Sequence, residues 1–179
     1  NISLIKDLSK QVGKWIFMIN LPIFTLIFLF PGAALNILFG SEYIVAENAL
    51  RLLAFGWFFA SVLSISSNII SMVGKSRLIL FNIILVSIIS AVMNFVLVPI
   101  YGIDGAAFST MTCIILLNLL FFFQAKYFIS IAPLKRKMFR IFLVSLIPTF
   151  LLFLIKQVLT TNTFYLLILL VFYFVLYIL

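Results

Sequence analysis

The sequence has no histidine, a single cysteine and very few acidic residues. The cysteine, Cys113, lies inside an apolar run, so a disulfide within one chain is excluded. The acidic residues are Asp7, Glu42, Glu47 and Asp104. Zinc and catalytic-thiol sites need clusters of histidine, cysteine or carboxylate ligands, which this composition hardly supplies. We therefore expect no metal site, no cofactor and no catalytic residues.

Charge of either sign is scarce, and apolar residues are abundant. Of the 179 residues, 66% are hydrophobic and 9% charged, with a mean hydropathy of +1.37. A helix of about 20 apolar residues crosses a bilayer once. The sequence predicts an all-α integral membrane protein with about six transmembrane helices, which short connections such as 38–48 and 74–77 join as antiparallel hairpins. The expected spans are 15–37, 49–73, 78–99, 106–128, 139–157 and 162–179.

The basic residues alternate between the two sides of the predicted spans. The net charge is +8, and ten of the 12 basic residues precede the first span, separate the second from the third, or separate the fourth from the fifth. The opposite side holds Arg51 and Lys156 with Glu42, Glu47 and Asp104. Loops rich in Lys and Arg stay in the cytoplasm. The pattern predicts a multi-pass protein of the cytoplasmic membrane with both termini cytoplasmic, whose basic residues contact membrane lipids and not nucleic acid.

The chain begins at Asn1, without an initiator methionine, and residues 1–14 are polar and basic, unlike a signal peptide. We expect this segment to be a cytoplasmic approach to the first span, and the chain to be part of a longer protein. Residues 15–128 are expected to form four transmembrane helices. Residues 129–179 are expected to form a basic cytoplasmic loop and an additional transmembrane hairpin.

Small and polar residues recur at intervals of four along the second predicted span. They are Gly56, Ala60, Ser64, Asn68 and Met72. In lipid, small side chains let two helix backbones approach closely. The pattern therefore indicates a seam for helix packing or, alternatively, one wall of a polar cavity.

Two further side chains allow a structural and a functional interpretation. Asn94, in the third span, needs hydrogen-bond partners that either a neighbouring helix or a hydrated cavity would supply. Arg51 lies near the start of the second span, and Glu47 precedes it by four residues on the same helical face. The two charges either form an ion pair at the membrane interface or leave Arg51 to bind a phosphate with its paired N–H donors.

The segment NFVLVPIYGIDGAAFSTM, residues 94–111, joins the third and fourth spans. Pro99 is expected to end the third span, since proline lacks an N–H group. Gly102 and Gly105 permit a compact turn that a bulky residue would oppose. These three residues predict a tight hairpin on the side of the membrane opposite to most basic residues.

Three segments together resemble one family of transporters. LFGSEYIVAENALRLLAFG (38–56), GKSR (74–77) and NFVLVPIYGIDGAAFST (94–110) occur in the order and spacing of polysaccharide-export flippases. These are the O-antigen-type transporters of the multidrug/oligosaccharidyl-lipid/polysaccharide superfamily. The resemblance covers about residues 15–128. It implies a protein of two pseudo-symmetric helical bundles, of which this chain is the C-terminal portion.

The resemblance implies export of a lipid-linked oligosaccharide diphosphate by alternating access, for which the N-terminal half of the same transporter is a necessary partner. In this hypothesis, a cation binds the diphosphate while the sugar crosses through a polar lumen. Arg51 is the proposed cation, and Asn68 and Asn94 are the proposed polar lining. The family motifs themselves look structural, so no role is transferred to them.

Three alternatives remain open. The first is a multidrug-type exporter of the same superfamily, although no carboxylate lies well inside a span, where such pumps commonly place one. The second is a polytopic glycosyltransferase, for which Glu42 and Glu47 would be the metal ligands. The third is an inactive fragment or scaffold subunit. The transporter hypothesis is preferred, so no enzymatic activity is expected.

Overall fold

A computed structural model describes residues 2–129 except residues 64 and 73, and every element in this part of the chain is a helix. Three of its segments are long and apolar enough to cross a membrane: Gln11–Leu29, Ser41–Leu63 and Ser76–Tyr127. The expected helical membrane fold is therefore confirmed for this part. The predicted spans 139–157 and 162–179 lie outside the described residues, so the six-span arrangement stays a prediction.

The first helix, α1 (Ile2–Leu29), does not match the predicted span 15–37. It starts earlier, because the basic approach segment is already helical, and it ends before residue 37. Phe30 leaves the helical conformation (φ −126°, ψ 50°), and Pro31 begins a second helix, α2 (Pro31–Phe39). Proline has no N–H to donate but suits the first position of a helix. The prediction of one unbroken span to residue 37 is wrong for this reason.

The predicted loop 38–48 is mostly helical. Gly40, at φ +100°, ends α2, and its N–H donates to the carbonyls of Asn36 (3.1 Å) and Leu35 (3.2 Å). A 3₁₀ helix, η1 (Ser41–Ala46), follows and leads directly into α3 (Glu47–Leu63). The chain therefore folds back beside the end of α1 before it crosses again.

Helix α3 packs along α1 through apolar and aromatic side chains. Phe17 and Leu21 of α1 are buried against Phe58 and Val62 of α3. The ring of Phe24 stacks on that of Phe58 with centroids 4.3 Å apart. These contacts fix the first two crossings as neighbours, as expected for a hairpin.

A short helix, α4 (Ile65–Met72), continues the second predicted span after the undescribed residue 64. The turn after it depends on Gly74, at φ +78°, whose N–H donates to the Ser71 carbonyl at 3.0 Å. Ile70 of α4 is buried against Phe121 and Ala125 of the last described helix. The GKSR segment is thus a tight connection, as the sequence predicts.

The last described helix, α5 (Ser76–Ile129), is a hairpin of two helical arms. Gly102 breaks it with φ +57° and ψ −127°, a conformation that side chains with a Cβ oppose. We call residues 76–101 the first arm and residues 103–129 the second arm. The predicted hairpin between the third and fourth spans is confirmed.

The turn differs from the prediction at one residue. Pro99 does not end the first arm, which remains helical to Tyr101. Proline removes only one backbone hydrogen bond, whereas the reversal itself needs the positive φ of Gly102. Gly105 serves a different purpose, because a Cβ there would lie 2.8 Å from the carbonyl carbon of Leu97 and closer still to its oxygen.

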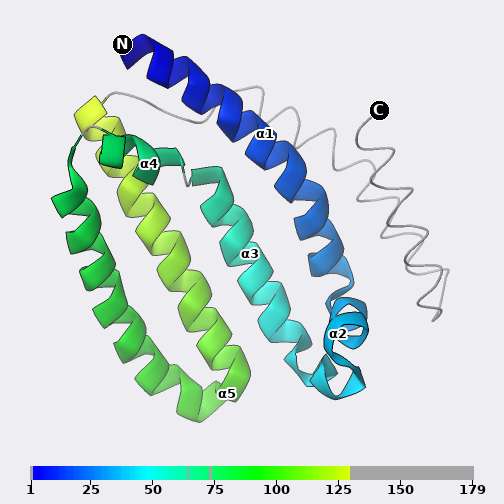
Figure 1. Ribbon diagram of the computed structural model, residues 1–179. Coiled ribbons are helices and arrows are strands. Elements are labelled where there is room, and N and C mark those ends of the chain that lie inside the picture. Colours follow the sequence, from blue (N-terminus) through cyan, green and yellow to red (C-terminus); the bar gives the residue numbers. More distant parts are fainter. Residues whose placement is uncertain (1, 64, 73, 130–179) are drawn as a thin grey trace.

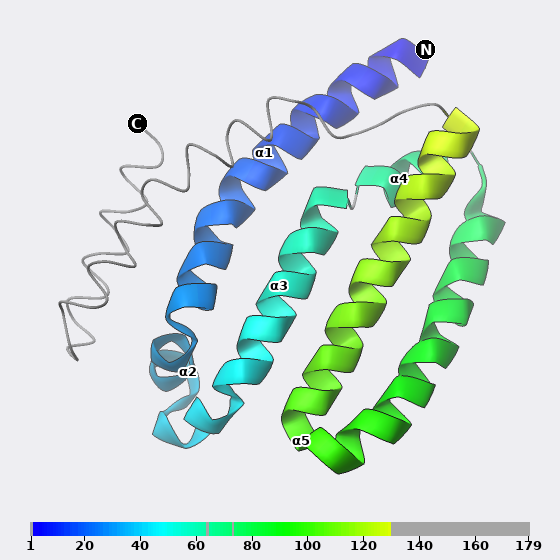
Figure 2. The ribbon, with the colours of Figure 1, turned by 180° about the vertical axis from the view of Figure 1, so that it is seen from behind.

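The crossings stand side by side in one row. Figures 1 and 2 show the order α1, α3, second arm, first arm. We call the two levels at which the helices end along their axes the two ends of the row. Helix α4 lies near one of these ends (Figure 1). Helix α2, η1 and the Gly102 turn lie at the other end. The first arm therefore forms an edge of the described row, and its Phe95 is 83% exposed.

Candidate functional site

Arg51 and Glu47 form an ion pair on the first turns of α3. The Arg51 Nη2 atom donates to Glu47 Oε1 at 2.5 Å, and the two side chains are 37% and 36% exposed. The predicted pairing on one helical face is confirmed. Both groups keep access to the surroundings, so the guanidinium retains N–H donors for a further acceptor.

Helix α2 borders this pair. The Glu47 carboxylate lies beside Gly32, where a Cβ would be 3.3 Å from Glu47 Oε2. Gly32 is in the first turn of α2, and the positive end of a helix dipole favours a neighbouring carboxylate. Glu47 is thus surrounded by two positive partners, Arg51 and the α2 N-terminus, which leaves it a poor candidate for the metal site of the glycosyltransferase alternative.

Asn94 bonds within its own arm. Its Nδ2 atom donates to the Ser90 carbonyl at 2.9 Å and lies 3.3 Å from Ser90 Oγ. Ser109 makes the connection between the arms, because its buried hydroxyl donates to the same Ser90 carbonyl at 3.5 Å. The Asn94 side chain is partly exposed. Of the two partners that the sequence allowed for Asn94, a neighbouring helix is not the one observed, and the bond between the helices is made by Ser109.

Asn68 lies elsewhere. It is exposed on α4, and α4 and the start of α3 are at opposite ends of the row (Figure 1). From Arg51 to the end of α3 at Leu63 the helix rises by about 18 Å. Arg51 and Asn68 therefore cannot contact the same phosphate group, and the three proposed binding residues do not form one compact pocket.

The small-residue seam is a packing seam in its first half. Gly56 and Ala60 are buried, and a Cβ on Gly56 would lie 3.1 Å from Met111 Cα in the second arm. Further along, Asn68 and Met72 are exposed. Close helix packing thus accounts for the start of the pattern and not for its end.

A pair of amides that was not predicted from the sequence joins the two arms of α5. Asn82 Nδ2 donates to Gln124 Oε1 at 2.7 Å, and Gln124 Nε2 donates to Asn82 Oδ1 at 3.0 Å. Asn82 is only 2% exposed. The two residues are far apart in sequence, and the only available signal was that each is a polar residue near the basic end of an apolar span.

In contrast to these amides, the hydroxyl of Ser66 is buried without a hydrogen-bond partner among the described residues. Ser66 lies near the start of α4 and is fully buried. In an unbroken helix, such a hydroxyl usually bonds a carbonyl one turn earlier. In this structure the carbonyl of Val62, one turn earlier, is not its partner.

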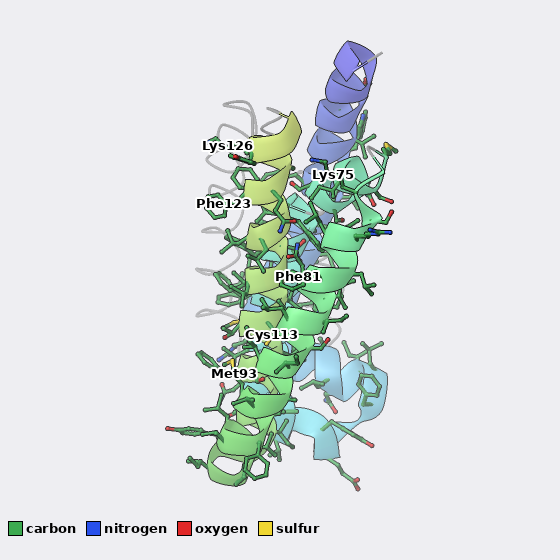
Figure 3. All side chains as sticks on the ribbon, turned by 90° about the vertical axis from the view of Figure 1, so that its left-hand side faces the viewer. Lys75, Phe81, Met93, Cys113, Phe123 and Lys126 are labelled. Carbon is green, nitrogen blue, oxygen red and sulfur yellow. The ribbon has the colours of Figure 1, made fainter. Side chains whose placement is uncertain are left out.

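The two lysines Lys75 and Lys126 lie away from the carboxylates Glu42 and Asp104. Figure 3 shows Lys75 and Lys126 near one end of α5, whereas Met93 and Cys113 lie toward the other end. Glu42 belongs to η1 and Asp104 to the Gly102 turn, both away from these lysines. Within residues 2–129, apart from 64 and 73, no group of three or more His, Cys, Asp or Glu side chains could hold a metal ion.

Comparison with known proteins supports the membrane assignment. Over 109 residues the chain is 33% identical to an uncharacterized membrane protein, MJ1068, of Methanocaldococcus jannaschii. The match covers 59% of this chain and 21% of that protein, so the chain spans about a fifth of its relative's length. No protein-family model and no solved structure matches the chain. The chain is a helical membrane protein.

Proposed function

We propose that this chain is the C-terminal portion of a flippase that exports a lipid-linked oligosaccharide across the cytoplasmic membrane. The observation that carries the proposal is Arg51, a partly exposed guanidinium at one end of a row of apolar helices, paired with the Glu47 carboxylate. A guanidinium presents paired N–H donors that suit phosphate oxygens. The resemblance of residues 38–56, 74–77 and 94–110 to polysaccharide-export flippases supports the same function.

In this mechanism, Arg51 binds the diphosphate of the substrate while the lipid tail stays in the bilayer. Glu47 holds the guanidinium in place and is itself fixed against Gly32. Asn94 on the first arm and Asn68 on α4 lie at other depths, so each would contact the sugar at a different stage of its passage. Alternating access requires a second bundle that moves against this one, which fits a chain spanning a fifth of its relative.

Replacing Arg51 tests the proposal directly. We expect full-length Arg51→Ala to lose about 10- to 100-fold in transport, since hydrogen bonds to charged groups contribute about 1.5–3 kcal/mol. Transport is scored as surface polysaccharide in a bacterial strain that lacks its own flippase, with the abundance of each variant measured. Arg77→Ala is the matched control, because Arg77 is an exposed arginine at the opposite end of the row, and it should transport normally.

The outcomes separate the parts of the proposal. If the unmodified full-length protein is abundant in the membrane and restores no polysaccharide, export of lipid-linked sugar is wrong. If it restores export and Arg51→Ala does so equally well, the function stands and Arg51 is not the phosphate ligand.

A further inference from the structure

Large apolar side chains are exposed on the segment that folds back between α1 and α3. Leu38 is 72%, Phe39 64% and Val45 83% exposed. They belong to a set of six exposed apolar residues on α2 and η1, which we call the α2–η1 patch: Ile37, Leu38, Phe39, Tyr43, Ile44 and Val45. Contact of such a set with water would be unfavourable, because water disfavours exposed apolar surface.

The two halves of α2 differ in composition and exposure, which indicates what covers the patch. Its small residues, Gly32, Ala33 and Ala34, are partly covered, and Gly32 meets the Glu47 carboxylate. In the second half of α2, Leu35 is buried, and the large residues that follow it, 37–39, are exposed. Contacts between helices in a membrane favour small side chains, whereas surfaces that face lipid carry bulky apolar ones. The composition of the patch therefore favours lipid over another helix.

The place of the patch in the fold agrees with this. Large apolar residues of α1, among them Ile23 and Phe28, are exposed as well, and α2 follows directly after that crossing. It lies at the same end of the row as the Gly102 turn, whose Tyr101 is also exposed (Figure 1). Phe39 and Tyr43 in the patch contact each other with ring centroids 5.7 Å apart, and tyrosine is enriched at the level of the lipid headgroups.

We propose that the α2–η1 segment, residues 31–46, is an interfacial anchor that inserts its patch into the acyl-chain boundary of one leaflet. This is the leaflet away from Lys75 and Lys126. Glu42 is exposed within the same segment, and its carboxylate marks the edge that stays in water. Interfacial helices bury their apolar face about 5–10 Å deep, which places the Arg51–Glu47 pair near the phosphates of that leaflet. The inference holds whether or not the protein is a flippase.

Spin labels can measure this directly in the full-length protein reconstituted into vesicles of phosphatidylcholine and phosphatidylglycerol. Three variants, Val45→Cys, Leu38→Cys and Glu42→Cys, are each labelled at the new cysteine. Any cysteine in the rest of the full-length protein is replaced beforehand. Cys113 is buried and stays in place. Collision rates with oxygen, which partitions into lipid, and with a water-soluble nickel chelate give the environment of each label.

We expect the ratio of oxygen to nickel collisions to be several-fold higher at positions 38 and 45 than at position 42. A nickel-dominated ratio at all three positions would overturn the anchor and restore an aqueous loop. Low collision rates with both reagents at positions 38 and 45 would also overturn it, because they would show that protein covers the patch. Neither readout depends on transport.

Discussion

At Gly56, two backbones approach so closely that any side chain would require a neighbouring atom to shift. A Cβ at this position would lie 3.1 Å from both Cα and Cγ of Met111. The methionine side chain can move, but the backbone atom can do so only if α3 and the second arm separate. Gly56 therefore sets the distance between the two helices that hold the middle of the row.

We expect Gly56→Leu to destabilise the protein by about 1–3 kcal/mol, the usual cost of overpacking. The measurement is the thermal unfolding temperature in detergent. Ala91→Leu adds a similar volume on the exposed face of the first arm and serves as the control. If both variants unfold at the same temperature as the unmodified protein, α3 and the second arm are not in close contact at residue 56.

Glycines were also the residues whose roles the sequence indicated best. The positive φ at Gly102 and the close approach at Gly105 both follow from the absence of a Cβ, which is a local property. The roles of Asn94 and Ser109 could not be predicted in the same way. Which of two polar residues bonds across a helix pair depends on the rotation of both helices, which no short segment determines.

At the scale of elements, the two arms of α5 are joined inside an apolar environment by the Asn82–Gln124 amide pair. Each amide satisfies the other, so removing one leaves a buried polar group without a partner. Removing both leaves an apolar contact. The two amides should therefore contribute to stability jointly, so that the effects of replacing them are not additive.

We expect Asn82→Leu and Gln124→Leu each to destabilise the protein by about 1 kcal/mol, and the double variant to lose less than the sum of the two. Denaturation in mixed micelles gives the coupling free energy. Asn118→Leu provides a comparison, because the Asn118 amide donates to the Ile114 carbonyl of its own arm at 2.9 Å. Strictly additive losses would show that the two amides do not interact.

Some helix boundaries differ from those predicted, because a proline does not have the same effect at every position. The prolines at 22, 31 and 99 all stand in apolar runs, yet α1 continues through Pro22, α2 begins at Pro31 and the first arm continues past Pro99. Inside a helix a proline removes one hydrogen bond, whereas at the first position it removes none, and packing around it decides whether the helix continues. The glycine after Pro31 was an unused signal, since Pro-Gly commonly marks a turn.

For the whole molecule, the charge distribution predicts a fixed orientation in the membrane. Lys75 and Lys126 are at the end of the row away from Glu42 (Figure 3). Positively charged ends stay in the cytoplasm. We expect Glu42→Cys in intact cells to react with a membrane-impermeant maleimide, and Ser76→Cys to react only after the cells are permeabilised. The reverse pattern would invert the assigned topology.

The overall architecture was predictable in so far as it depends on hydropathy and charge. The lengths of the apolar runs predicted four crossings in the described part, and the positions of the basic residues predicted that these crossings alternate in direction. Both predictions succeed because hydropathy and charge are properties of whole segments. The proposed site was not predictable to the same degree. Arg51 and Glu47 are one helical turn apart and could be paired by spacing alone, whereas the distance between Arg51 and Asn68 depends on how α4 is placed.

The arms of α5 touch at three levels: Asn82 with Gln124, Ser90 with Ser109, and Leu97 with Gly105. Two helices pinned at three heights cannot slide along each other unless all three contacts break. If this part of the protein rocks, the two arms must therefore move together as one rigid body. Its bending points have to lie outside the hairpin, and the Gly74 turn, which joins it to α4, is the nearest one in the described chain.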